Sequence, residues 1–201
     1  MTDTADTWRA WKESTFGSEY MIWHDGLDID AVTRLHGDPR AHAVDMLRLG
    51  LSLHDAHAAQ ALAAMGEAAD RDAILAQISR TTGAQRVRLA LAAHRLRPDP
   101  ALSAHLIAVL NSAAHWGERI DAAIGLRHFT APTDEPALLD ALGDRDYLVR
   151  YHASETLLAR WHIHPTDISK HPRIFELIRP DGPITAAAHA EARALLRSLR
   201  R

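Results

Sequence analysis

Apolar positions recur along this chain at helical spacing, and short polar turns interrupt them at regular distances. The clearest stretch covers 134–161, DEPALLDALGDRDYLVRYHASETLLARW. Its apolar positions fall into two groups: Leu138, Leu139 and Leu142, then Leu148, Val149, His152, Ala153, Thr156 and Leu157. This spacing predicts two helices joined by a turn, because residues three or four apart share a helix face. We expect Gly143 to end the first helix and Asp144 or Asp146 to cap the second.

The same pattern recurs in other parts of the chain. In each predicted second helix an alanine stands four residues before a leucine: Ala58/Leu62, Ala92/Leu96, Ala122/Leu126, Ala153/Leu157 and Ala192/Leu196. The steps between these alanines are 34, 30, 31 and 39 residues. A single helical hairpin cannot bury its apolar faces alone, so near-equal hairpins in series predict a stack in which each packs on its neighbours. The expected fold class is all-α, a short α-solenoid of about five helical hairpins.

Composition supports the helical interpretation. The chain of 201 residues is 47% hydrophobic and contains 37 alanines, and alanine is the strongest helix former. No segment shows the sustained alternation that indicates a strand. The chain contains no cysteine, which excludes disulfides, thiolate catalysis and cysteine-ligated metal centres. Net charge is −3, so the composition carries no general basic field for nucleic acid.

The stretch 134–161 resembles a HEAT repeat of the short PBS-lyase type. The residues that match are Asp144 in the turn, then Val149, Arg150, Ala153 and Leu157 on the second helix. The stretch 70–130 matches in part, and the hairpin at 38–66 departs from the pattern by placing Asp55 where Arg150 sits. The resemblance implies an α-solenoid whose second helices line a concave face. It does not imply an activity, because function resides in sites built on a fold.

The two ends differ from the middle, and we divide the chain into 1–37, a capping segment; 38–162, HEAT-like repeats; and 163–201, a proline-rich loop with a capping hairpin. Residues 1–30 hold five of the 11 aromatics: Trp8, Trp11, Phe16, Tyr20 and Trp23. We interpret them as a seal over the first repeat, since terminal repeats are atypical. The alternative is a recognition patch, since Trp and Tyr are favoured anchors at interfaces.

The first residues, MTDTADTWRAWKES, are polar and acidic, unlike a signal peptide. No apolar run approaches the roughly 20 residues that a membrane span needs. We therefore expect a cytoplasmic protein, and the alanine- and arginine-rich composition would suit a bacterial source.

Catalytic candidates are sparse. His54 and His57 are expected three residues apart on one helix, where they would share a metal ion, and His36 or His42 would have to complete the ligand set. With 14 histidines in the chain, such pairs arise by chance, so we expect no metal and no other cofactor. We expect His162 and His164, at a helix end, to satisfy carbonyls or the helix dipole.

Arg150 is expected to pair with a turn aspartate of its own or the neighbouring hairpin, because its planar fork fits a carboxylate. The candidate recognition surface lies one step further round the second helices. On the 134–161 hairpin it comprises Tyr147, Tyr151 and Glu155; on the earlier hairpins the counterparts are Trp116, Ile120, Arg86, His94 and Gln60. Exposed tyrosine, tryptophan, arginine and histidine have the composition of a protein-binding face.

These observations favour a non-catalytic module that binds another protein through its concave face, such as a bacterial immunity or adaptor protein. One alternative is an enzyme on a HEAT-like scaffold, either lyase-like or a metal-dependent hydrolase. The other is a nucleic-acid-binding HEAT-like protein. The nucleic-acid-binding alternative is disfavoured because it needs a basic concave surface, whereas Asp55, Gln60 and Glu155 are mixed with the arginines of the second helices.

Overall fold

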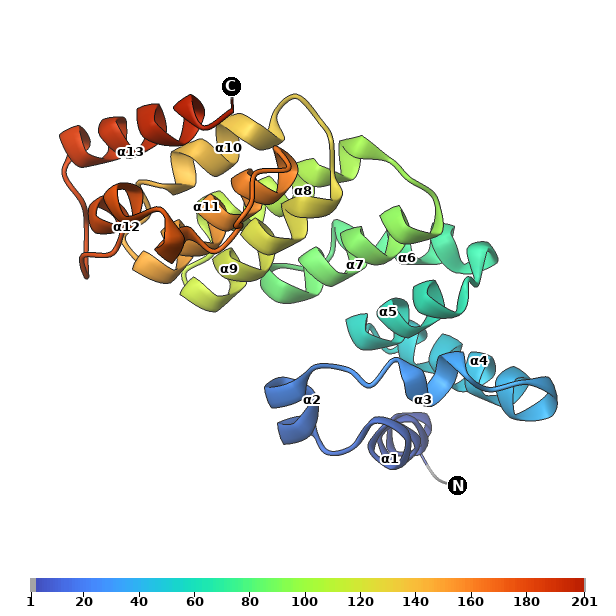
Figure 1. Cartoon of the computed structure of the whole chain (residues 1–201). Coiled ribbons are helices and arrows are strands. Elements are labelled where there is room, and N and C mark those ends of the chain that lie inside the picture. Colours follow the sequence, from blue (N-terminus) through green and yellow to red (C-terminus); the bar gives the residue numbers. More distant parts are fainter. Residues whose placement is uncertain (1–2, 201) are drawn as a thin grey trace. The chain divides into compact units, whose positions relative to one another are not determined.

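The computed structural model of the chain describes residues 3–200, and within that range all regular structure is helical (Figure 1). The prediction of an all-α fold without a sheet is therefore confirmed for these residues. The chain divides into two compact units, Met1–Asp99 and Pro100–Arg201. This division falls inside the predicted repeat region 38–162. Within residues 3–200, no helix combines the length and the apolar character needed to cross a membrane.

The first unit begins with three helices and continues with two helical hairpins. Its helices are α1 (Thr4–Phe16), α2 (Glu19–Asp25), α3 (Asp30–Thr33), α4 (Gly37–Ser52), α5 (Ala56–Met65), the 3₁₀ helix η1 (Ala68–Asp70), α6 (Arg71–Ile78) and α7 (Gly83–Leu96). Helix α4 packs against α5, and α6 packs against α7. The two hairpins meet through their second helices, α5 and α7.

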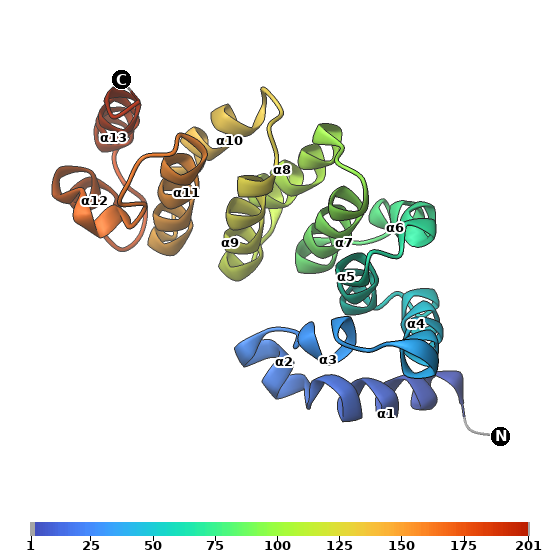
Figure 2. The same cartoon turned by 45° about the vertical axis from the view of Figure 1, so that its right-hand side comes forward.

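The second unit contains three further hairpins (Figure 2). Its helices are η2 (Pro100–Leu102), α8 (Ser103–Ser112), α9 (Trp116–Gly125), η3 (Leu126–His128), α10 (Asp134–Ala141), α11 (Tyr147–Arg160), η4 (Ile168–Lys170), α12 (Pro172–Ile178) and α13 (Ala186–Ser198). The pairs are α8 with α9, α10 with α11, and α12 with α13. Helix α11 lies between its neighbours and packs on both α9 and α12. All five predicted helical pairs are therefore present.

The alanine–leucine pattern identifies buried positions correctly. All five alanines are buried: Ala58, Ala92, Ala122, Ala153 and Ala192. Four of the five leucines are completely buried, and Leu96 near the end of α7 is half-buried. A small side chain at these positions lets neighbouring helices approach closely, whereas the following leucine fills the core.

The turn between α10 and α11 follows the prediction in one respect and departs from it in another. Asp146 caps α11 as expected, because its carboxylate accepts a hydrogen bond from the backbone N–H of Leu148 at 2.9 Å. Helix α10 ends at Ala141 with Leu142 as its C-cap, so Gly143 is the first residue beyond the cap, one position later than predicted. A Cβ at Gly143 would lie 3.0 Å from the imidazole of His189 on α13, so a larger residue here would require that ring to shift.

Some of the N-terminal aromatics are buried, as a seal over the first repeat requires, and others are exposed, as a recognition patch requires. Trp8 and Phe16 on α1 are buried, and Trp8 lies against Gly50 of α4 so closely that a Cβ there would approach its ring to 2.5 Å. These side chains seal the first hairpin, as a terminal segment is expected to do. Tyr20 and Trp23 on α2, in contrast, are exposed to solvent.

Replacing Ala153 with leucine should lower the free energy of unfolding by about 1–3 kcal/mol, because the larger side chain must push α11 away from its neighbours. Ala153 is fully buried on α11, the helix that packs on α9, α10 and α12. The matched control is Ala190→Leu at an exposed position of α13, which should leave the thermal melting temperature almost unchanged. Equal melting temperatures for the two variants would contradict the packing shown for Ala153.

Candidate protein-interaction surface

The candidate surface in the second unit lies on α9 and α11, which pack side by side (Figure 2). We call it the α9–α11 face and define it by Trp116 and Ile120 on α9 and Tyr147, Tyr151 and Glu155 on α11. Trp116 and Tyr147 are 45% and 36% exposed, which is high for large apolar side chains. Ile120, Tyr151 and Glu155 are half-buried. The exposed part of the face is therefore its aromatic edge.

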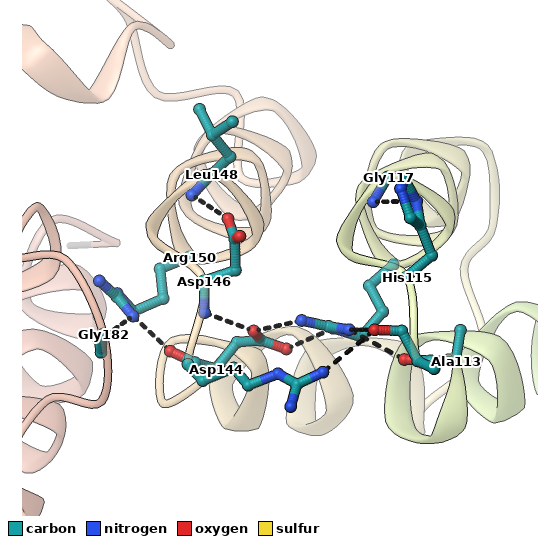
Figure 3. A network of polar contacts seen from close by, with 11 residues as sticks. Ala113, His115, Gly117, Asp144, Asp146, Leu148, Arg150 and Gly182 are labelled. Carbon is teal, nitrogen blue, oxygen red and sulfur yellow. Dashed lines mark hydrogen bonds and ion pairs between the residues drawn. The ribbon is translucent and has the colours of Figure 1, made fainter.

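Trp116 and Tyr147 occupy equivalent places, since each is the first residue of its helix. The residue before each one is the N-cap: His115 accepts a hydrogen bond from the Gly117 N–H at 3.2 Å through Nδ1, as Asp146 does from Leu148 (Figure 3). The His115 ring also stacks on the Trp116 indole, with centroids 5.4 Å apart and planes 24° apart. This stacking holds the exposed indole in place, and the sequence pattern alone did not indicate it.

The two turns that carry these aromatics are joined by a buried arginine. Arg119 on α9 forms a bidentate pair with Asp144 of the next hairpin, at 2.8 Å from Nε and 2.9 Å from Nη2 (Figure 3). Its third nitrogen, Nη1, donates to the carbonyl of Ala113 at 2.8 Å and to that of Ala114 at 3.1 Å. A fork held on both sides in this way fixes one turn against the other.

Asp144 is the centre of this connection. Besides Arg119, its carboxylate accepts the backbone N–H of Asp146 at 2.8 Å, which shapes the turn. Arg145 in the same turn donates to the Ala114 carbonyl at 3.0 Å. The aspartate that the sequence proposed as a possible helix cap therefore links two hairpins instead.

Arg150 is connected differently from the prediction. Its guanidinium bonds to main-chain carbonyls, those of Asp144 and of Gly182 at 3.1 Å (Figure 3). It also bonds to the carbonyls of Ile178, at 2.7 Å, and Pro180. The expected pairing of Arg150 with a turn carboxylate is thus wrong, and Arg119 makes that pair. Burial lowers the pKa of Arg150 below its ordinary value. The nearby carboxylates of Asp144, Asp146 and Asp181 act in the opposite direction but do not outweigh burial. Arg119 and Arg150 together connect three successive turns of the second unit.

Tyr151 is held within its own chain. Its hydroxyl donates to Asp167 Oδ1 at 3.1 Å, and its ring meets Phe175 of α12 edge-on, with centroids 6.4 Å apart. Burial, together with the negative charges of Glu155 and Asp167, raises the pKa of Tyr151 to about 12. Glu155 lies 3.4 Å from Nδ1 of His152. These contacts give Tyr151 a structural role between α11 and the following segment.

The remaining predicted surface residues lie in the first unit. Gln60 is half-buried on α5, and Arg86 and His94 are half-buried on α7. His94 Nδ1 accepts the backbone N–H of Asp99 at 3.0 Å, so its ring secures the chain where it leaves α7. The eight predicted residues are therefore divided between the two units, and the α9–α11 face contains five of them.

The histidine pair proposed for a metal does not share a helix. His54 has a φ of 65° in the turn between α4 and α5, whereas His57 lies on α5. Nδ1 of His57 lies 3.2 Å from Asp55 Oδ1 and 3.3 Å from Lys12 Nζ. In the described part of the chain, no three His, Cys, Asp or Glu side chains form a group that could hold a metal ion.

Asp55 and Lys12 form a polar cluster that the sequence analysis missed. Lys12 Nζ lies 2.6 Å from Asp55 Oδ2, the Trp8 indole N–H donates to the same oxygen at 3.1 Å, and Oδ1 accepts the backbone N–H of His57 at 2.9 Å. Burial favours the neutral acid, yet the hydrogen bonds from His57 and Lys12 prevail and hold the pKa of Asp55 well below its ordinary value. The cluster joins α1 to the start of α5.

Comparison with known proteins gave no relatives: no family model, no curated protein and no solved structure matches this chain.

Proposed function

We propose that this chain is a HEAT-type helical-repeat protein that binds another protein through the α9–α11 face, as a bacterial immunity or adaptor protein would. The observation that carries the proposal is the pair of exposed aromatics, Trp116 and Tyr147, at equivalent positions of neighbouring second helices. Exposed aromatic side chains of this kind are the commonest energetic anchors of protein interfaces.

The support beneath these aromatics adds to the argument. Arg119 and Asp144 join the two turns, and His115 stacks on Trp116. The Trp116 indole is therefore ordered before a partner binds, so less conformational entropy is lost on binding. The resemblance of 134–161 to a HEAT repeat supports the same proposal, since the second helices of such repeats line a concave binding surface.

Truncating both anchors should abolish most of the binding without unfolding the protein. We expect Trp116→Ala and Tyr147→Ala each to cost about 2 kcal/mol of binding free energy, roughly thirtyfold in affinity. The measurement is affinity purification with the wild-type chain, followed by calorimetric titration of the isolated partner against wild type and the double variant.

The matched control truncates an exposed apolar side chain that belongs to no proposed binding face, Leu53→Ala at the C-cap of α4, and should retain the affinity of wild type. Thermal melting should be similar for all three proteins, because the altered side chains are exposed. A partner that binds the Trp116/Tyr147 double variant as tightly as wild type would exclude the α9–α11 face as its binding site.

A further inference from the structure

Helix α2 presents an unusual concentration of exposed apolar surface. Tyr20, Met21 and Trp23 are 68%, 51% and 79% exposed, and they are three of the six large hydrophobic side chains that are exposed among residues 3–200. The helix has only seven residues, of which Ile22 alone is buried. Contiguous exposed apolar side chains on a protein surface usually mark a place of contact.

The aromatic rings of α2 lie close together. The rings of Tyr20 and Trp23 are 6.2 Å apart between centroids with their planes tilted by 40°, and the imidazole of His24 stacks on Tyr20 at 5.8 Å. The helix is held at both ends. Ser18 caps it by accepting the Met21 N–H at 3.4 Å, and the Gly26 N–H donates to the Ile22 carbonyl at 3.1 Å.

The charge around these rings is negative. From Ser18 to Thr33 the chain has four carboxylates, Glu19, Asp25, Asp28 and Asp30, and no lysine or arginine. Two of them are engaged locally, since His24 Nδ1 lies 2.6 Å from Asp25 and Arg34 pairs with Asp30. Glu19 and Asp28 are exposed.

A hollow of 440 Å³ beside α2 extends this surface towards α1. Glu13, Glu19 and Tyr20 line it together with two cations, Arg9 and Lys12. Both cations are already paired: Arg9 with Asp6 at 2.8 Å and Lys12 with Asp55 at 2.6 Å. The carboxylates of Glu13 and Glu19 therefore give the hollow a negative rim.

We propose that the α2 face, defined by the rings of Tyr20 and Trp23 with the carboxylates of Glu19 and Asp28 in the same segment, docks a basic segment of another protein. An arginine side chain meets both features: its guanidinium stacks on the faces of Trp and Tyr rings, and its charge is attracted by the carboxylates. The same negative charge repels phosphate groups, which makes nucleic acid and anionic membranes poor occupants.

This surface shares no residue with the α9–α11 face, and separate variants test the two proposals. The probe is a short fluorescein-labelled arginine–glycine peptide, titrated into the whole chain and followed by fluorescence anisotropy. A second peptide with citrulline in place of arginine keeps the shape but lacks the charge. We expect the arginine peptide to bind, the citrulline peptide to lose most of that affinity, and added salt to weaken binding.

Four double variants locate the binding. Tyr20→Ala with Trp23→Ala should weaken the arginine peptide about tenfold or more, which corresponds to about 1.4 kcal/mol. Glu19→Gln with Asp28→Asn should weaken it and flatten the dependence on salt. Trp116→Ala with Tyr147→Ala should bind as wild type does. If alanine disturbs α2, Tyr20→Leu with Trp23→Leu keeps the apolar surface without the aromatic rings and should show the same loss.

Several results would overturn the proposal. These are failure of the wild-type chain to bind the arginine peptide, equal binding of the citrulline peptide, or undiminished binding by the Tyr20/Trp23 variants. Tighter binding of a labelled oligonucleotide or of anionic vesicles than of the arginine peptide would also overturn it, in favour of a polyanionic occupant.

Discussion

Replacing Arg150 with alanine should lower the free energy of unfolding by about 3–5 kcal/mol, because buried carbonyls lose a charged donor and a cavity remains. Arg150 is completely buried and bonds to carbonyls of two different turns, those of Asp144 and Gly182 among them. Chemical denaturation of the whole chain measures the loss. Amide hydrogen exchange should assign it to the second unit, between α10 and α13.

The matched control is Arg145→Ala. Arg145 belongs to the same turn and also donates to a carbonyl, that of Ala114, but its side chain is exposed. We expect this change to cost less than about 1 kcal/mol, since water replaces the lost bond. Similar losses in both variants would show that burial of Arg150 contributes little to the stability of this turn.

Replacing Asp55 with alanine should lower the free energy of unfolding by about 3–5 kcal/mol at neutral pH. The change leaves Lys12 without its counter-charge in a mostly buried position, with 14% of its side chain exposed. It also removes the N-cap of α5 and the acceptor of the Trp8 indole N–H. Thermal or chemical denaturation of the two proteins gives the difference.

The free energy of unfolding that Asp55→Ala loses should become smaller as the pH falls. The pKa of Asp55 is lowered in the folded state, so its carboxylate contributes stability fully above its ordinary pKa of about 3.9 and loses that contribution as pH falls below it. Wild type and Asp55→Ala should therefore differ by a constant amount near neutrality and converge in acid.

The control for this series is Asp45→Ala, at an exposed position of α4. It should cost at most about 0.5 kcal/mol, as surface substitutions usually do. A difference between wild type and Asp55→Ala that stays constant from neutral pH to strong acid would contradict the assigned role of the ionised carboxylate.

The helices and their pairing were predictable because the signals for them are local. Helical spacing of apolar residues, caps such as Asp146 and the alanine–leucine pairs each act within a few positions of the chain. The final hairpin, α12 (Pro172–Ile178) and α13 (Ala186–Ser198), also lies within 163–201, where the sequence placed a capping hairpin.

The partners of polar side chains were not predictable, because they come from distant parts of the chain. Asp55 meets Lys12 across 43 positions, and Arg119 meets Asp144 across 25. From the sequence alone, several arginines are equally good partners for a carboxylate in a turn. Only the packing of the hairpins decides that Arg119 reaches Asp144 while Arg150 reaches carbonyls.

The aromatic side chains show the same division. By itself, the sequence determined that aromatics gather at the N-terminus and recur at the starts of second helices. Only the tertiary structure decided that Trp8 is buried against Gly50, that Trp23 and Trp116 are exposed, and that Tyr151 is held by Asp167. The physical reason is that exposure depends on which helix packs over a residue, whereas helix formation depends mainly on its neighbours in sequence.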